Sequence, residues 1–541
     1  DVVSQTWGIG RGFQQTAFIF LFFGFFLTLV LVWYHGEEGR QRVSGPELLI
    51  IAVLLVIAGG VLSIIRPPGE GPRGAGPSNP QETLEDRPPI AVLPFENLSP
   101  NPADAYFADG MQEEILSKLA QISSLKVLSR SSVMQFREER PGVPEMAAQL
   151  GADFFLEGSA RIAGGLVRLT AQLIDATSDG HLWSAQYDQP LVLDSLMAVQ
   201  GLIADSVAFK LEATLTPRER EVIQESPTEN LEAYELYLQG RFLWNQRTEP
   251  EMRRALGVFN QAIALDSSYA LAYAGLADVY LTLLSWDFAP FDEAMPGAEG
   301  ALQKALSLNP LMGEARTSLG LVLESRGDVA GAGVEFRRAL ELAPNYATGH
   351  HWYAQYLARR GYFDDALTHI RYAESLDPLS RMITANSGWI QFLKGDYPAA
   401  ITYLEALTQL EPEFAHGWSL LGLAYGEAGR LEDGIAAMDR SFELEPWPNV
   451  ILSLARLHAL AGNEEYARAV VEDVHPRHDP VREAQVFVAL GDVDRALELL
   501  EDGIRGNSPN LLALGVEPQW DPIRDDPRFG EVLRRLGFPG P

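Results

Sequence analysis

Two long runs of apolar residues stand near the start of the chain. Residues 17–34 (AFIFLFFGFFLTLVLVWY) and 48–65 (LLIIAVLLVIAGGVLSII) each hold eighteen residues without a charge, which is enough to cross the hydrocarbon core of a bilayer. Trp33 and Tyr34 end the first run, and such residues are enriched at membrane interfaces. The pattern therefore predicts two transmembrane helices within a membrane anchor of residues 1–66.

A stretch rich in proline and glycine follows the second run. Residues 66–80 (RPPGEGPRGAGPSNP) hold five Pro and four Gly, which predicts an extended linker over 67–88. A G-x-G-x-x-G spacing begins at Gly69, but Pro72 interrupts it and no strand precedes it. The spacing therefore does not indicate a nucleotide site.

Short apolar segments then alternate with segments of helical period over residues 89–216, which predicts an α/β domain. The run IAVLPF at 90–95 fits a buried strand, and Gly164 with Gly165 fits the turn of a hairpin. The other expected elements are helices at 104–120, 143–150 and 194–215, and strands at 125–128, 154–162, 166–175 and 181–187.

From residue 228 to 510 the sequence repeats with a period of 34 residues. The period is set by Pro310, Pro344, Pro378, Pro412 and Pro446, and by Gly327, Gly361, Gly395 and Gly429. A 34-residue repeat with small residues where two helices touch is typical of tetratricopeptide repeats (TPRs). We expect an all-α solenoid of about seven or eight units, closed by a capping tail at 511–541. The unit at 270–310 carries about nine extra residues, which we expect between its helices.

The first helix of each unit lines the concave face of such a solenoid, and this face predicts a groove for other proteins. The candidate partner-binding residues on it are His351, Gln355, Arg359, Trp389, Phe392, His416 and Glu427. Trp389 and Phe392 could anchor a partner, because buried aromatic residues dominate binding energies. They could equally seal neighbouring helices, and the sequence leaves both interpretations open.

The composition narrows the possible chemistry. The chain has 541 residues and no cysteine, which excludes disulfides, cysteine-ligated metal sites and a thiol nucleophile. It has 42 basic and 73 acidic residues, and 42 − 73 gives a net charge of −31. Nucleic acid is a poor partner for such a chain, because phosphate binding needs clustered Lys and Arg. The charge favours a partner with a basic or mixed surface.

Catalytic, cofactor-binding and metal-binding residues are not predicted. The polar residues of the α/β domain that could do acid–base work are Asp109, Glu113, Glu114, Glu157 and His181. A solvated helix face and polar strand ends explain them as well. His350 and His351 are adjacent on a helix and point about 100° apart, which suits metal chelation poorly. The chain is therefore predicted not to be an enzyme and to need no cofactor.

The α/β segment resembles a known family. IAVLPFENLSPNPADAYFADGMQEEILSKLAQ and LGADFFLEGSARIAGGLVRLTAQLIDATSDGHLWSAQYD, within residues 88–215, are similar to the TolB amino-terminal-like domain. Bacterial families place this domain after membrane spans and before TPRs, in regulators with a winged-helix, kinase or cyclase module upstream. The segment at 24–50 also resembles these proteins. The resemblance implies a cytoplasmic loop at Arg40 and Arg42 and a periplasmic soluble part.

These patterns predict a membrane-anchored scaffold for protein–protein interaction in the bacterial inner membrane. It would be an accessory subunit that docks on, assembles or stabilises a larger membrane complex, for example a respiratory or photosynthetic one. Its partners would be other proteins and the lipid bilayer, and not nucleic acid. The alternative is a periplasmic sensory or regulatory module of a signalling protein whose cytoplasmic effector is absent from this chain.

Overall fold

The computed structural model describes residues 87–138, 140–285, 288–474, 479–506 and 508–538. Within these ranges no helix combines the length and the apolar character needed to cross a bilayer. The spans predicted at 17–34 and 48–65, and almost all of the linker predicted at 67–88, lie outside the described residues. The predicted fold class with two transmembrane helices, and the inner-membrane localisation built on it, are corrected accordingly. The fold that is described is an α/β domain followed by an all-α solenoid.

The α/β domain is built on one mixed sheet with the strand order β3-β1-β4-β5-β6, and β2 also pairs with β4. The strands are β1 Pro89–Val92, β2 Glu96–Asn97, β3 Lys126–Val127, β4 Phe154–Ala163, β5 Leu166–Asp175 and β6 Gly180–Pro190. β1 runs parallel to β3 and β4, whereas β4, β5 and β6 form an antiparallel meander. Gly164 and Gly165 have φ of +60° and +75° and form the two-residue turn between β4 and β5, which confirms the predicted hairpin.

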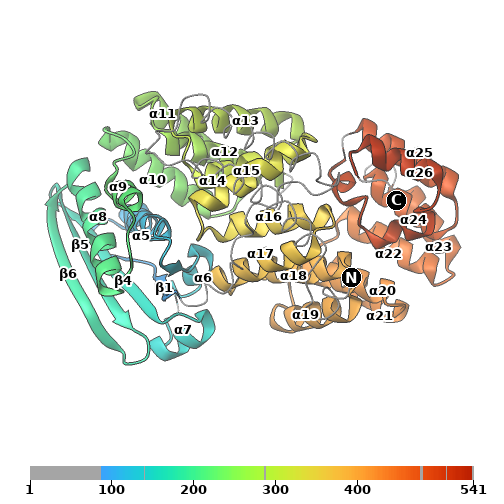
Figure 1. Ribbon diagram of the computed structural model, residues 1–541, viewed down its shortest axis with the longest axis horizontal. Coiled ribbons are helices and arrows are strands. Elements are labelled where there is room, and N and C mark those ends of the chain that lie inside the picture. The colour runs from blue at the N-terminus through green and yellow to red at the C-terminus, as the bar shows by residue number, and fades with distance from the viewer. Residues whose placement is uncertain (1–86, 139, 286–287, 475–478, 507, 539–541) are drawn as a thin grey trace, which may run out of the picture. The chain divides into compact units, whose positions relative to one another are not determined.

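Helices cover both faces of the sheet (Figure 1). Ile90 and Val92 of β1 pack with α5 Ala105–Ala120 and α8 Leu193–Lys210 on one face. Ala91 and Leu93, which alternate with them, pack on the other face with α6 Arg130–Met134 and α7 Val143–Leu150. This alternation follows from the two-residue period of a strand and gives the sheet two apolar cores.

The helix expected at 194–215 ends five residues earlier than predicted, and a second helix follows beyond the expected range. α8 ends at Lys210, and Glu212 has a φ of +53°, a conformation that does not continue a right-handed helix. α9 Pro217–Gln224 then begins with a capping box, in which the Thr216 hydroxyl and the Glu219 carboxylate each accept a backbone N–H.

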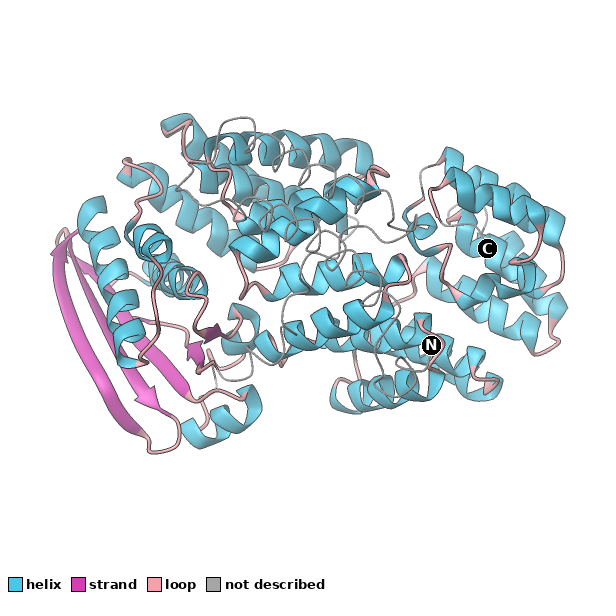
Figure 2. Cartoon of the chain, viewed as in Figure 1, coloured by secondary structure: helices cyan, strands magenta, loops and turns pink. Residues whose placement is uncertain are grey.

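Antiparallel helix pairs make up the rest of the chain (Figure 2). The pairs are α10 Leu231–Asn245 with α11 Glu249–Leu265, α12 Ala270–Ser285 with α13 Phe291–Leu308, α14 Gly313–Ser325 with α15 Val329–Leu342, α16 Ala347–Arg359 with α17 Phe363–Leu376, α18 Arg381–Leu393 with α19 Tyr397–Leu410, α20 Ala415–Glu427 with α21 Leu431–Leu444, α22 Pro448–Leu460 with α23 Glu464–Val474, and α24 Pro480–Ala489 with α25 Val493–Arg505.

The predicted repeat chemistry is visible in the pair α14 and α15. Phe336 is fully buried, and a Cβ atom built on Gly320 would lie 3.0 Å from its ring, so the glycine allows the two helices to approach closely. Gly327 lies between the helices with a φ of +83°. The extra residues of the 270–310 unit mostly lengthen its helices, because α12 has 16 residues and α13 has 18, against 13 and 14 in the next unit.

The C-terminal residues cap the last helix pair. They form η2 Pro509–Ala513, η3 Pro518–Ile523 and α26 Pro527–Arg535. Trp520 and Phe529 are fully buried there, and their stacked rings lie 5.7 Å apart between centroids. This packing removes from water the apolar face that a terminal repeat would otherwise expose.

Candidate functional site

Polar side chains connect the first helices of neighbouring repeats. The Arg359 guanidinium on α16 donates to both carboxylate oxygens of Glu324 on α14, at 2.9 and 2.5 Å. Gln355 of α16 donates to Asn386 of α18 at 2.8 Å. The Arg456 guanidinium of α22 lies 2.5 Å from Glu427 of α20. We call this series the first-helix ladder. Because each of these contacts joins two neighbouring repeats, the ladder fixes the distances between the first helices that form the predicted partner-binding surface.

The predicted partner-binding residues differ in how much of each side chain is exposed and free to contact a partner. His351 is buried and lies 3.1 Å from the Gln355 amide, and Glu427 and Arg359 are engaged in the ladder. Trp389 is half-buried and His416 is exposed. Phe392 is only 2% exposed and packs beside Tyr397, because it fills the seam between α18 and α19. Of the two interpretations left open for Phe392, its burial supports the one in which it seals neighbouring helices.

Trp389 and Arg359 border a small cavity of about 170 Å³ whose opposite wall is the C-terminal segment. The other lining residues are Arg482, Pro509, Asn510, Leu512, Ala513 and Glu517. Glu517 is buried and accepts hydrogen bonds from Gln485 at 2.8 Å and from Arg482 at 3.3 Å. The Arg360 guanidinium lies 4.8 Å from the ring centroid of Phe538. The C-terminal cap therefore reaches back to the turn after α16.

A second group of charged residues joins the α/β domain to the first repeat. Arg241 on α10 forms an ion pair with Glu113 on α5, at 2.5 Å, and with Asp278 on α12, at 3.2 Å. Burial opposes ionisation of Glu113, but the guanidiniums of Arg241 and Arg130 outweigh it and hold the pKa of Glu113 below its ordinary value. Glu113 is therefore an ionised and paired carboxylate between two domains.

Glu114, the next residue on α5, is in a different state. It is buried beside Lys118, and burial raises its pKa to about 7 although the Lys118 ammonium opposes the shift. Lys118 itself donates to the carbonyls of Ile223 and Glu225, at 2.7 and 3.3 Å. Burial therefore favours the neutral form of the Glu114 carboxyl group.

The α/β domain also contacts the middle of the solenoid. Asp377, at the end of α17, accepts hydrogen bonds from the hydroxyls of Ser131 and Ser132 on α6, at 2.6 and 2.5 Å. The Leu379 N–H donates to Ser132 at 3.1 Å. Asn345, between α15 and α16, donates to the carbonyls of Ala120 and Ile122. We call these contacts the α6–α17 bridge. It joins segments about 245 residues apart in the sequence.

The candidate acid–base residues do not form one group. Asp109, Glu113 and Glu114 share α5, and Asp109 lies 2.5 Å from Arg137. Glu157 is on β4 and pairs with Gln172, whereas His181 is exposed on β6. Asp109 is therefore held in an ion pair within the α/β domain, Glu113 in an ion pair with the first repeat, and Glu114 is buried, whereas His181 lies on a different element.

The sequence interpretation missed a histidine pair. His350 of α16 and His369 of α17 lie with their Nδ1 atoms 3.0 Å apart and their rings stacked 5.2 Å apart. Burial, with the neighbouring His369, lowers the pKa of His350 to about 3, and burial lowers that of His369 to about 4. One ring must donate and the other accept at this distance, which excludes protonation of both rings, and the lowered pKa values favour the neutral pair.

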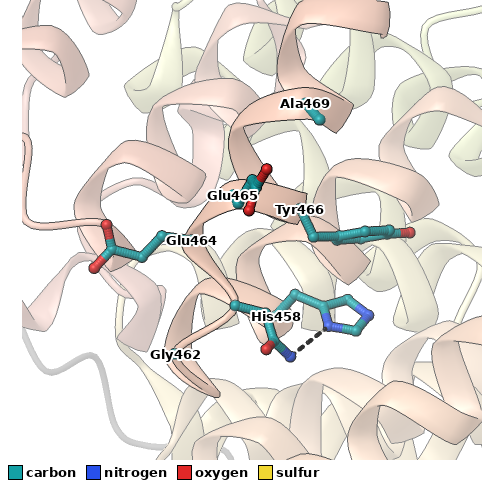
Figure 3. Close-up of a pocket in the computed structure, with 7 residues that line it drawn as sticks. His458, Gly462, Glu464, Glu465, Tyr466 and Ala469 are labelled. Carbon is teal, nitrogen blue, oxygen red and sulfur yellow. Dashed lines mark hydrogen bonds between the residues drawn. The ribbon is translucent and has the colours of Figure 1, made fainter.

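A surface depression of about 560 Å³ lies at the turn between α22 and α23. Figure 3 shows the His458 and Tyr466 side chains on its wall, with Glu464 and Glu465 beside them. The His458 and Tyr466 rings lie 4.3 Å apart, and Asn463 lies 3.2 Å from His458 Nδ1. The charged groups that line it are acidic, so it suits a basic group better than an anion.

Family models match two parts of the chain. Residues 86–196 match the second domain of HilA/YgeH-like transcriptional regulators. Residues 296–347, 353–413 and 394–449 match a tetratricopeptide-repeat model. The 34-residue period predicted TPRs, and these matches together with the helix pairs confirm them. The match over the α/β domain does not confirm the TolB-like resemblance, which stays a prediction.

Several known proteins are similar to this chain. "Putative adenylate cyclase 3" of Rhizobium meliloti strain 1021 is 33% identical over 251 residues, which cover 46% of this chain and 42% of the relative. The transcriptional regulator HilA of Salmonella typhimurium strain LT2 is 23% identical over 322 residues, which cover 58% and 55%. The pilF structure of Pseudomonas aeruginosa is 23% identical, covers 37% of this chain and 95% of that one, and has a TM-score of 0.29. The chain thus spans about half the length of the curated relatives it matches.

Proposed function

We propose that this chain is a protein-interaction scaffold whose solenoid receives another protein on the surface formed by its first helices. The observation that carries the proposal is Trp389, a half-buried aromatic side chain beside Arg359 on that surface. Aromatic and arginine side chains dominate the binding energy of protein interfaces when they are partly exposed in the free protein. The first-helix ladder supports the proposal, because a surface fixed before binding loses little entropy on binding.

The finer part of the proposal concerns the partner. We propose that it belongs to a larger protein assembly in which this chain is an accessory subunit. The net charge of −31 favours a partner with a basic or mixed surface. The ladder guanidiniums are already paired with Glu324 and Glu427, so a partner gains more from contacts with Trp389 than from new ion pairs.

Site-specific photo-crosslinking in the native host tests the proposal. A photoreactive residue replaces Trp389 in one variant and Trp447, which is 58% exposed at the start of α22, in a matched control. We expect a discrete crosslinked protein from position 389 that is absent from position 447. W389A should then reduce recovery of that protein at least tenfold, and W447A should not. Equal crosslinking at both positions, or none at 389, overturns the proposal.

A second candidate function is a regulatory module that joins a binding solenoid to an effector on the same polypeptide. The observation that favours it is the similarity, over 46% and 58% of this chain, to two proteins named as a cyclase and a transcriptional regulator. Immunoblotting of native cells with an antibody against residues 89–216 distinguishes the two candidates. An effector-bearing polypeptide should migrate well above the mass of these 541 residues. A single band at that mass would exclude the regulatory candidate.

A further inference from the structure

Strand β6 leaves one edge of the sheet open. It has eleven residues and, among the described strands, it pairs with β5 alone. It is the outermost strand of the sheet in Figure 1. A long edge strand presents a row of backbone donors and acceptors, and proteins usually protect such edges with lysines, bulges or a covering element. β6 contains no lysine or arginine, and its bulge, at which Leu182 is the extra residue, lies near its start.

The hydrogen-bond pattern shows which residues of β6 face outward. The Leu191 N–H donates to the Gly165 carbonyl at 2.9 Å, so the adjoining pair of Leu166 and Pro190 is not hydrogen-bonded. Hydrogen-bonded and non-hydrogen-bonded pairs alternate along an antiparallel ladder. The N–H and C=O groups that point away from β5 are therefore those of Ser184, Gln186 and Asp188.

The side chains at this edge are arranged symmetrically about Gln186. Leu182, four residues before it, is 39% exposed, and Pro190, four residues after it, is exposed beside Val192. The strand has one carboxylate, Asp188, and its charge is paired with Arg168, whose Nε lies 2.5 Å away. The edge is thus apolar at both ends, and its one carboxylate, Asp188, is neutralised by Arg168.

We propose that this edge pairs with the same edge of a second copy of the chain, antiparallel and with a two-fold axis at Gln186. In this register Gln186 faces Gln186 of the partner subunit, and Ser184 faces the Asp188 position of the other copy. The three outward pairs form about six backbone hydrogen bonds. Leu182 meets the Pro190 position of the other copy at both ends, so apolar residues meet apolar residues.

The local charges of the edge are compatible with a second copy as the occupant, because each Asp188 is already paired with Arg168 of its own chain. The two Asp188 carboxylates are displaced by four residues along the paired strands, about 14 Å at 3.4 Å per residue. This separation exceeds the Debye length of about 8 Å at physiological salt, so their repulsion is largely screened. Each Asp188 instead faces a Ser184 hydroxyl, which can donate to it. The chain's net charge of −31 opposes association at long range, so added salt should strengthen the pairing.

Cysteine crosslinking of the full chain tests the register, because the native chain has no cysteine. Hydrogen-bonded antiparallel partners have Cα atoms about 5.5 Å apart, a separation that a disulfide spans. Q186C should therefore form a disulfide-linked dimer under mild oxidation. S184C is the matched control, since its Cα atoms would lie about 14 Å apart, beyond the reach of a disulfide. Equal crosslinking of the two variants overturns the proposal.

Sedimentation analysis of the unmodified chain, from about 1 to 100 µM, measures the association itself. We expect a monomer–dimer equilibrium that Q186P abolishes, because proline removes an outward N–H while the β5–β6 ladder is untouched. Q186T keeps the N–H and should keep the dimer. Circular dichroism and the melting temperature check that Q186P is folded. A wild-type chain that stays monomeric at the highest concentration, or a dimer that Q186P does not weaken, overturns the proposal.

Discussion

Replacement of Asp377 is the sharpest test of the α6–α17 bridge. Asp377 is buried, and it accepts two short hydrogen bonds from Ser131 and Ser132 of a different domain. A hydrogen bond to a charged group contributes about 1.5–3 kcal/mol. D377A removes both bonds, and we expect it to lower the free energy of unfolding by about 2–4 kcal/mol.

A double-mutant cycle separates the bond from the other effects of each substitution. S132A removes one donor to Asp377 and also leaves the Leu379 N–H without its acceptor. The cycle of D377A, S132A and the double variant should give a coupling energy of about 1–2 kcal/mol, measured by urea unfolding. D377N, which keeps the shape and one acceptor oxygen, should lose less than D377A. A coupling below about 0.5 kcal/mol would show that the bridge does not join the two domains energetically.

Three further predictions concern burial and pH. The pKa of Glu114 is raised to about 7 in the folded chain, against about 4.3 in the unfolded chain. The neutral side chain is therefore tolerated at low pH, and folding stability is lost as pH rises through 7 and the buried carboxyl group ionises. In urea unfolding, E114Q should match the parent chain near pH 4.5 and exceed its stability by about 2–4 kcal/mol at pH 8. The pKa values of His350 and His369 are lowered to about 3 and 4, so stability should fall as pH drops below about 6.5. Thermal unfolding of the H350Q/H369Q variant should show a smaller slope, and the part that remains comes from His351, whose pKa burial lowers to about 4. F336A leaves a cavity at a fully buried site and should lower the free energy of unfolding in urea by about 3–5 kcal/mol. The control V334A, on the exposed side of the same helix, should change it by less than about 0.5 kcal/mol.

The repeat architecture was predictable because each unit must satisfy the same steric demands. Gly327 is needed for a left-handed turn residue, and Gly320 is needed because the Phe336 ring occupies the space of a side chain. Such demands recur every 34 residues, so they are visible as a period. The hairpin at Gly164 and Gly165 was predictable for the same local reason.

The junction between the domains was not predictable from one sequence. Arg241 and Asp377 look like ordinary surface charges, and their partners in the α/β domain lie more than 120 residues away in the sequence. Only the fold brings α5 and α6 against the solenoid. One usable signal was present, since Glu324 and Arg359 lie one period plus one residue apart and so face each other on successive first helices.

The sequence could not decide between the two interpretations of Phe392 for a related reason. It lies on the same helix as Trp389, three residues further on, and a small error in helical phase exchanges the inner and outer faces. Aromatic residues are common both in seams and at binding surfaces, so residue type could not correct the phase.

The α6–α17 bridge also bears on how the solenoid responds to force. A free stack of repeats behaves as a spring, because each unit contacts only its neighbours and small rotations add along the stack. Here the α/β domain holds α10 through Arg241 and the end of α17 through Asp377, so the repeats between them are tied at both ends. The later repeats are held too, because the C-terminal cap contacts the turn after α16 through Arg360 and Phe538. A pulling force should therefore be resisted by these long-range contacts before the repeats can move apart.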